Sequence, residues 1–192
     1  MFFKKRKGTY GYLKKAPVFQ GLLTILLLIL PAGLFLIGYS ITKDVKNLFT
    51  IAAVVGMLPA AKSIVSFIMY LRSEKYTCPE SLYKEISPLA GDNMLIGYDY
   101  FLTSYSVNYP IPAACVAKKC LIGYMSNPKL KSTDTENHIK EYCTKNEIKG
   151  ITVKIFDSED KFVERAKSLS GSEEELSEDE MKAFELLSSL CL

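Results

Sequence analysis

The apolar stretch that decides the fold of this chain is residues 18–41, VFQGLLTILLLILPAGLFLIGYSI. It lies within 27 uncharged residues, 16–42, which are bounded by Lys15 and Lys43. At about 1.5 Å per helical residue, this stretch can cross a hydrocarbon layer of roughly 30 Å with room to tilt. A secretory signal peptide is the alternative, but the apolar run is too long and no convincing small-residue cleavage site follows it. The stretch therefore predicts a transmembrane helix.

A second apolar run, residues 47–71, is interrupted only by Lys62. Because the connecting turn, residues 43–47, is short, the two runs predict an antiparallel hairpin whose ends emerge on the same side of a membrane. Basic residues before the first run and after the second outnumber the two in the turn. The positive-inside bias then predicts a protein of the cell (inner) membrane with two spans and cytoplasmic N- and C-termini.

The basic N-terminal arm predicts contact with anionic lipids. A basic residue near such a membrane surface contributes about 1 kcal/mol of attraction. The residues expected to contact lipid are Lys4, Lys5, Arg6, Lys7, Lys14 and Lys15.

Small residues and prolines indicate how the two predicted spans pack. Close backbone approach favours small residues, and depth counted from the turn places Pro31 nearly level with Pro59 and Gly33 level with Gly56. The expected packing residues are Pro31, Gly33, Ala52, Gly56, Pro59 and Ala60. Packing within the hairpin is the first interpretation, and a homo-oligomer seam is the alternative.

Lys62 is the intramembrane charge of the second span. A lysine at the bilayer centre costs about 2.5 to 3.5 kcal/mol on insertion scales, and neither span offers an acidic partner. If the membrane boundary falls near Ser66, Lys62 lies about 6 Å from it and reaches the interface with its long side chain. A transport or proton-relay role would require more spans or self-assembly.

Charge is segregated along the chain. Residues 1–72 hold ten Lys or Arg and one acid, whereas residues 73–192 hold fourteen Lys or Arg and twenty acids. The acidic second part removes the charge argument for a nucleic-acid partner. We expect this part to stand off from an anionic leaflet and to meet a cytosolic or membrane protein partner.

Residues 73–170 predict a small cytoplasmic α/β (α+β) domain. A helix begins near Pro79, strands fall within residues 94–103 and 113–125, and Thr133 with Glu136 matches a capping box that opens a second helix. A strand at residues 151–155 and a helix capped by Asp157 or Ser158 follow. The predicted order is one helix, two or three strands, then helix, strand and helix.

The last 22 residues predict an acidic linker and an amphipathic helix. Ser177 and Glu180 form another capping-box pattern. The helix then presents an apolar stripe of Met181, Phe184, Leu187 and Leu190. Docking onto the domain and binding of a partner helix both fit this stripe.

Metal and nucleophile patterns are weak in this sequence. All five cysteines follow the second span, so they are expected to be reduced thiols. Cys115 and Cys120 would point to opposite faces of a continuous strand, and His138 lies about 140° around a helix from Cys143. We therefore predict neither a metal site nor a cofactor.

The order of predicted elements is similar to the core of PD-(D/E)xK nucleases. Within that resemblance Asp99, Lys118 and Lys119 are the candidate catalytic residues, gathered around one cleft. The chemistry also needs a carboxylate two residues before the lysine to hold a metal ion. Val116 or Ala117 stands at that position, so the resemblance implies a degenerate, membrane-tethered relative.

Residues 47–72, NLFTIAAVVGMLPAAKSIVSFIMYLR, together with the basic arm and the GYL segment at residues 11–13, resemble uncharacterised two-span proteins of Gram-positive bacteria. Some of those proteins carry the automatic name O-linked GlcNAc transferase-like. The resemblance covers mainly the first 75 residues and transfers no catalytic residue. The helical repeats expected of such a transferase are absent from this sequence.

The predicted organisation is a juxtamembrane arm (1–17), a two-helix transmembrane hairpin (18–72), a cytoplasmic domain (73–170), and a linker with a terminal helix (171–192). The sequence assigns no biochemical activity and favours a non-enzymatic interaction or regulatory domain displayed on a membrane. The alternatives are the degenerate nuclease-like domain and a small transport or channel accessory subunit.

Overall fold

The structure is a computed structural model that describes residues 7–104, 107–171 and 175–192. The chain forms two compact units. Of the described residues, one unit comprises Lys14–Glu74, and the other comprises residues 7–13 with Lys75–Leu192. The residues just before the first long helix therefore belong to the same unit as the C-terminal 118 residues.

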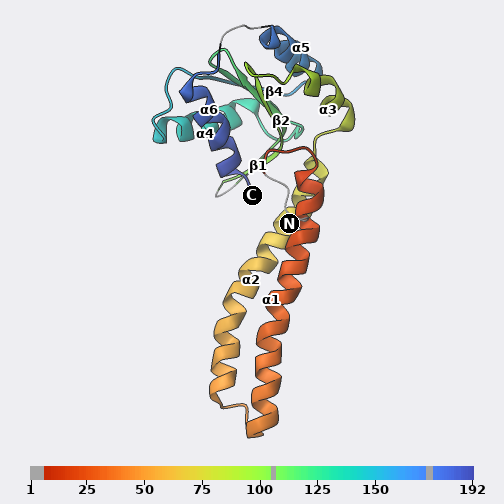
Figure 1. The fold of residues 1–192 in the computed structure, drawn as a ribbon, viewed down its shortest axis with the longest axis vertical. Helices are drawn as coiled ribbons and strands as arrows, with labels where there is room; N and C mark the ends of the chain where they lie inside the picture. Colours follow the sequence, from red (N-terminus) through yellow and green to blue (C-terminus); the bar gives the residue numbers. More distant parts are fainter. Residues whose placement is uncertain (1–6, 105–106, 172–174) are drawn as a thin grey trace. The chain divides into compact units, whose positions relative to one another are not determined.

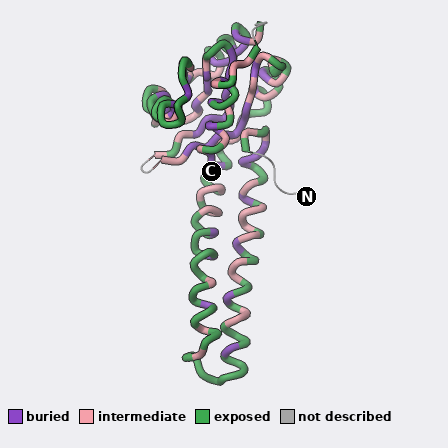
Figure 2. Tube along the Cα trace, turned by 60° about the vertical axis from the view of Figure 1, so that its left-hand side comes forward, coloured by how far each residue is buried: buried purple, intermediate pink, exposed green. Residues whose placement is uncertain are grey.

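The first unit is a helical hairpin of α1 (Tyr12–Thr42) and α2 (Leu48–Ser73). Both helices are long and apolar enough to cross a membrane. Most of their large apolar side chains are exposed, and exposed residues, green in Figure 2, run along both helices. In the turn, the Asn47 side chain caps α2 by accepting a hydrogen bond from the Thr50 N–H. The predicted antiparallel hairpin of two apolar helices is confirmed.

The second unit contains a four-stranded sheet and four α-helices. Short 3-10 turns occupy Glu74–Tyr76 and Ser87–Leu89. The elements in chain order are α3 (Glu80–Ile86), β1 (Leu95–Thr103), β2 (Asn108–Ala117), β3 (Cys120–Tyr124), α4 (Ser132–Lys145), β4 (Thr152–Phe156), α5 (Glu159–Ser170) and α6 (Glu178–Leu190). The predicted order of helices and strands is confirmed, and the class is α+β.

The sheet is mixed, and its strand order is β1-β2-β3-β4. The first three strands pair antiparallel, whereas β4 pairs parallel to β3 after the crossover through α4. Helices α4 and α6 pack on one face of the sheet, and α3 and α5 pack on the other (Figure 1). Strand β2 is buried on both faces, so successive residues such as Ala114 and Cys115 join different hydrophobic clusters.

Residues 113–125 hold the end of β2 and all of β3, so three strands form where two or three were predicted, and Lys118 and Lys119 adopt positive φ in the turn between β2 and β3. One local prediction is wrong. Thr133 does not cap α4, since the helix starts at Ser132 after Lys131 without a side-chain cap. Glu136 is instead buried against β4, where its carboxylate accepts the Ile155 N–H and pairs with Lys154.

Helix α6 is part of the hydrophobic core. Its predicted capping box is confirmed, because Ser177 and Glu180 exchange both hydrogen bonds. Ala183 and Leu187 are fully buried in the cluster that also holds Tyr100 and Leu102 of β1. The sequence left open whether this helix docks onto the domain or binds a partner helix. The inner face of the helix docks onto the domain.

Candidate functional site

The two long helices meet along a seam that we define by the buried residues Thr24, Pro31 and Gly38 of α1 and Ala53, Ala60 and Ser63 of α2. The α1 residues recur every seven positions, as do Ala53 and Ala60. A repeat of seven keeps one face of each helix toward its neighbour in a left-handed crossing. Small residues on this face bring the two backbones close together.

Polar side chains join the helices at one level of the seam. Ser63 Oγ lies 2.8 Å from Thr24 Oγ1 and accepts a hydrogen bond of 3.0 Å from Gln20 Nε2. Thr24 also donates to the Gln20 carbonyl of its own helix. Interhelical hydrogen bonds of this kind stabilise helix pairs in lipid by about 0.6 to 2 kcal/mol. Gln20, Thr24 and Ser63 are not among the packing residues predicted from the sequence.

The predicted packing residues divide into two groups. Pro31 faces Gly56, where an added methyl group would lie 3.5 Å from the proline ring, and Ala60 is fully buried. Ala52 and Pro59 are exposed, and Gly33 points into open space. The helices are therefore offset from the predicted register by two to three residues, since Pro31 lies opposite Gly56, where Gly33 was expected, rather than near Pro59.

Lys62 lies outside the seam. Its side chain is exposed, although the next residue, Ser63, is buried between the helices. Among the described residues Lys62 makes no ion pair. This position agrees with a lysine that extends along the helix surface, and the hairpin itself provides no polar pathway for it.

The N-terminal arm is built into the second unit. The Gly8 carbonyl accepts the Tyr98 N–H at 2.9 Å on the outer edge of β1. Tyr10 stacks on Tyr83 of α3 with ring centroids 4.0 Å apart. Tyr12 Oη donates to the Leu192 oxygen at 3.2 Å, and Leu13 is fully buried. These contacts link residues 8–13 to β1, α3 and the C-terminal segment.

The basic residues predicted to contact lipid have different surroundings. Lys7 Nζ donates to the Cys191 carbonyl at 2.6 Å, so its ammonium group already has a partner in the same unit. Lys14 and Lys15 are exposed in the first turns of α1. Lys4, Lys5 and Arg6 lie outside the described residues.

Asp99, the first predicted catalytic residue, is almost completely buried, with 1% of its surface exposed. Its Oδ1 accepts the Cys78 N–H at 2.7 Å, whereas Oδ2 makes no hydrogen bond of good geometry to any described residue. Burial raises the pKa of Asp99, and the N–H groups of Cys78, Leu13, Gly11 and Tyr12 oppose this rise in pKa. Such an enclosed carboxylate has no access to a substrate.

Lys118 and Lys119, the other predicted catalytic residues, form the exposed turn between β2 and β3. The turn is fixed by its backbone, because Glu180 Oε1 accepts the Lys119 N–H at 2.7 Å and the Lys119 carbonyl accepts the Thr152 N–H. In the register of the sheet, Asp99 lies opposite Pro112, six residues before Lys118. At about 3.3 Å per residue this separates Asp99 from the turn by roughly 20 Å.

The three residues of the nuclease-like hypothesis therefore do not converge on one cleft. Strands β2 and β3 also contain no Asp, Glu or Lys at all. Within the part of the chain that the structure describes, no group of three or more His, Cys, Asp or Glu side chains could hold a metal ion. The topology fits the predicted order of elements, but these strands lack the groups that would activate water.

Four of the five cysteines are buried, and His138 packs against aromatic rings. Cys78, Cys115, Cys143 and Cys191 are buried free thiols, and burial raises the pKa of each, to about 12 for Cys78 and Cys191. His138 packs between the rings of Tyr109 and Tyr142, and burial lowers its pKa. Neither residue type is placed for nucleophilic chemistry, because reactive thiols require a lowered pKa and access to solvent.

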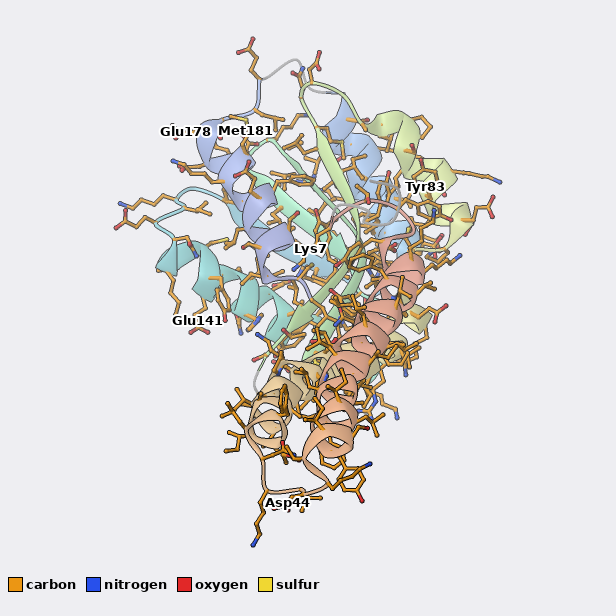
Figure 3. All side chains as sticks on the ribbon, turned by 60° about the horizontal axis from the view of Figure 1, so that its bottom comes forward. Lys7, Asp44, Tyr83, Glu141, Glu178 and Met181 are labelled. Carbon is orange, nitrogen blue, oxygen red and sulfur yellow. The ribbon has the colours of Figure 1, made fainter. Side chains whose placement is uncertain are left out.

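A groove of about 750 Å³ runs between the arm, β1 and α6. Ile96, Met181 and Phe184 contribute its apolar surface, and Glu185 lies at the same helix face. Met181 and Glu178 mark the outer side of α6 in Figure 3, and Met181 is 45% exposed. The outer face of α6 is therefore open, while its inner face is buried in the core.

Comparison with known proteins adds no functional assignment. No protein-family model matches the chain, and neither a curated protein nor a solved structure matches it.

Proposed function

We propose that this protein is an integral membrane protein that displays a non-enzymatic interaction or regulatory domain on the cytoplasmic face of a bacterial membrane. One observation carries the proposal. The second unit is made of two segments of the chain, one before and one after the apolar hairpin in the sequence. A chain that leaves one domain, crosses a membrane, and returns to the same domain must cross it an even number of times. In the sequence, two helices of spanning length separate the two parts of the domain.

The charge distribution supports the cytoplasmic side. Lys14, Lys15 and Arg72 flank the membrane-spanning helices on the domain side, whereas Lys43 and Lys46 lie in the turn together with Asp44. The larger number of basic residues is expected on the cytoplasmic side. The free thiols of the domain agree with a reducing compartment.

The lack of a catalytic arrangement among the described residues favours an interaction or regulatory role over the nuclease-like alternative. Asp99 is enclosed, and the two lysines lie about 20 Å along the strand from it. The partners of the protein would be anionic lipids and another protein. The resemblance to two-span proteins of Gram-positive bacteria remains a prediction.

Two introduced cysteines, one in the turn and one in α5, test this topology. Four native cysteines are buried, so replacing the partly exposed Cys120 with serine leaves a background of low thiol reactivity. In that background Asp44→Cys places a thiol in the exposed turn and Glu164→Cys places one on the exposed side of α5. With a membrane-impermeant maleimide, we expect intact cells to label Asp44→Cys and to leave Glu164→Cys unlabelled.

Glu164→Cys must become labelled once the cells are opened, which shows that the thiol itself reacts. Labelling of Glu164→Cys in intact cells would contradict the cytoplasmic assignment. Recovery of the protein in a soluble fraction without detergent would contradict membrane insertion altogether.

A further inference from the structure

Strand β4 forms one edge of the sheet, because the strand order is β1-β2-β3-β4. The Thr152 N–H donates to the Lys119 carbonyl at 2.8 Å, so Thr152 directs its backbone groups toward β3. Successive residues of a strand direct these groups to opposite sides. Val153 and Ile155 therefore point their N–H and carbonyl groups away from the sheet. Such an edge is a template for the addition of another strand.

The opposite edge of the sheet, β1, is covered by other segments of the same unit. The Gly8 carbonyl accepts the Tyr98 N–H at 2.9 Å, and the Leu192 N–H donates to the Phe101 carbonyl at 3.1 Å. Natural sheets protect their edges by covering them or by placing charged side chains on them. Backbone groups cover β1, whereas a charged side chain covers β4.

Glu136 of α4 is the side chain at the edge of β4. It is 7% exposed, and its Oε1 accepts the Ile155 N–H at 3.0 Å. The same oxygen lies 3.1 Å from Lys154 Nζ, and Oε2 lies 3.8 Å from Lys140 Nζ. Both lysine side chains are about half exposed, so they balance the charge of the carboxylate from the solvent side. The carboxylate thus takes the position that the carbonyl of an added strand would occupy.

A second copy of β4 would satisfy the backbone groups of this edge. In an antiparallel pair with a twofold axis at Lys154, the Ile155 N–H of one copy donates to the Val153 carbonyl of the other, and the Val153 N–H donates to the Ile155 carbonyl. The two Lys154 side chains would then lie directly opposite, where like charges oppose pairing. Glu136 and Lys154 therefore both act against this pairing, and Glu136 does so by occupying the donor at Ile155.

We propose that Glu136 closes the edge of β4 and thereby prevents two copies of this chain from pairing through β4. Removing its carboxylate exposes a self-complementary edge whose partner is a second copy of β4. This inference goes beyond the proposed function, because it concerns contacts within the second unit and holds on either side of a membrane. Its failure would leave the topology test unchanged.

A disulfide across the twofold axis measures pairing through β4. The sample is the full-length protein in detergent with Cys120→Ser, because the other four cysteines are buried. Lys154→Cys in this protein places a thiol at the centre of the pair. Opposite residues that are not hydrogen-bonded to each other have Cα atoms about 4.5 Å apart, which is within the range of a disulfide. After mild oxidation, non-reducing electrophoresis quantifies the linked dimer, and mass spectrometry identifies the linked peptide.

With Glu136 in place, we expect Lys154→Cys to give only a background level of linked dimer. Adding Glu136→Ala should raise the linked fraction about tenfold or more, because the Ile155 N–H loses its acceptor. Glu136→Gln should stay near the background, since the amide oxygen of glutamine can still accept this N–H. Glu141→Ala is the matched control, because Glu141 lies on the same helix and pairs with Lys145 at the surface.

A second cysteine position separates pairing through β4 from random collision. Glu164→Cys on the exposed side of α5, combined with Glu136→Ala, should stay at the background level. Equal linkage at positions 154 and 164 would contradict the proposal, as would a Glu136→Ala protein that links no more than its parent. Linkage as strong with Glu136→Gln as with Glu136→Ala would show that the oxygen at the edge is not what prevents pairing. Loss of the cooperative thermal transition in Glu136→Ala without linkage at position 154 would show that Glu136 only supports the fold.

Discussion

Residues 75–192 produced without the N-terminal arm will fail to form a stable domain. The arm buries Leu13 completely and Tyr12 to 6% exposure, and it covers the outer edge of β1 at Tyr98. Burying one leucine side chain contributes about 1.5 to 3 kcal/mol. Losing this burial, the Tyr10 stacking and the hydrogen bond from Tyr98 to Gly8 removes a large share of the roughly 5 to 15 kcal/mol that stabilises a typical domain. We expect the fragment to aggregate or to unfold without a cooperative thermal transition.

The matched sample restores the arm and omits the hairpin. Residues 5–13, joined by a flexible glycine and serine linker to residue 75, should give a soluble protein with a sharp thermal transition. The same linked protein with Tyr10→Ala and Leu13→Ala should behave like the fragment. A fragment of residues 75–192 that unfolds as cooperatively as the linked protein would show that the arm is not part of the domain.

Leu187→Ala is expected to destabilise the second unit by about 2 to 5 kcal/mol, the usual cost of removing a buried leucine side chain. Leu187 is fully buried between α6 and the sheet, in the cluster with Tyr100 and Ala183. The linked protein described above is the sample, and urea unfolding measures the free energy. Shortening the chain before α6 should be more damaging still, because it would expose the whole sheet face.

Met181→Ala on the same helix is the control. Met181 is 45% exposed, so its removal should change the free energy of unfolding by no more than about 0.5 kcal/mol. If Leu187→Ala were as mild as Met181→Ala, α6 would not be a core element. Its apolar stripe would then be available for a partner helix.

The hairpin could be predicted from the sequence because its signal is local. The uncharged residues 16–42 correspond to α1, and residues 47–71 correspond to α2, with ends that differ by a few residues. The register between the helices was predicted less well. Depth was counted residue by residue from the turn, whereas the seam follows the seven-residue spacing of Thr24, Pro31 and Gly38.

The arm could not be assigned from the sequence, because its contacts are distant along the chain. Gly8 contacts Tyr98 and Tyr12 contacts Leu192, at separations of 90 and 180 residues. Local patterns carry no information about such pairs. The basic residues of the arm predicted contact with lipid, and for Lys14 and Lys15 this stays a prediction. Lys7 instead donates a hydrogen bond to the Cys191 carbonyl.

The turn at Lys118 and Lys119 was missed for a different reason. Two consecutive residues with positive φ usually call for glycine or asparagine, and neither is present. The turn is stabilised instead by Glu180, which lies 61 residues away and accepts the Lys119 N–H. The same carboxylate completes the capping box of α6, and that part was predicted because Ser177 and Glu180 are neighbours in sequence.

Amide hydrogen exchange of the full-length protein tests most directly whether the arm and the C-terminal residues form one domain. In detergent, peptides that cover residues 9–13 should exchange as slowly as peptides from β1, because Tyr12 and Leu13 are buried and the Tyr12 N–H donates to the Thr9 carbonyl. A synthetic peptide of the arm provides the unprotected reference rate. Exchange of residues 9–13 at that reference rate, while β1 stays protected, would contradict the account.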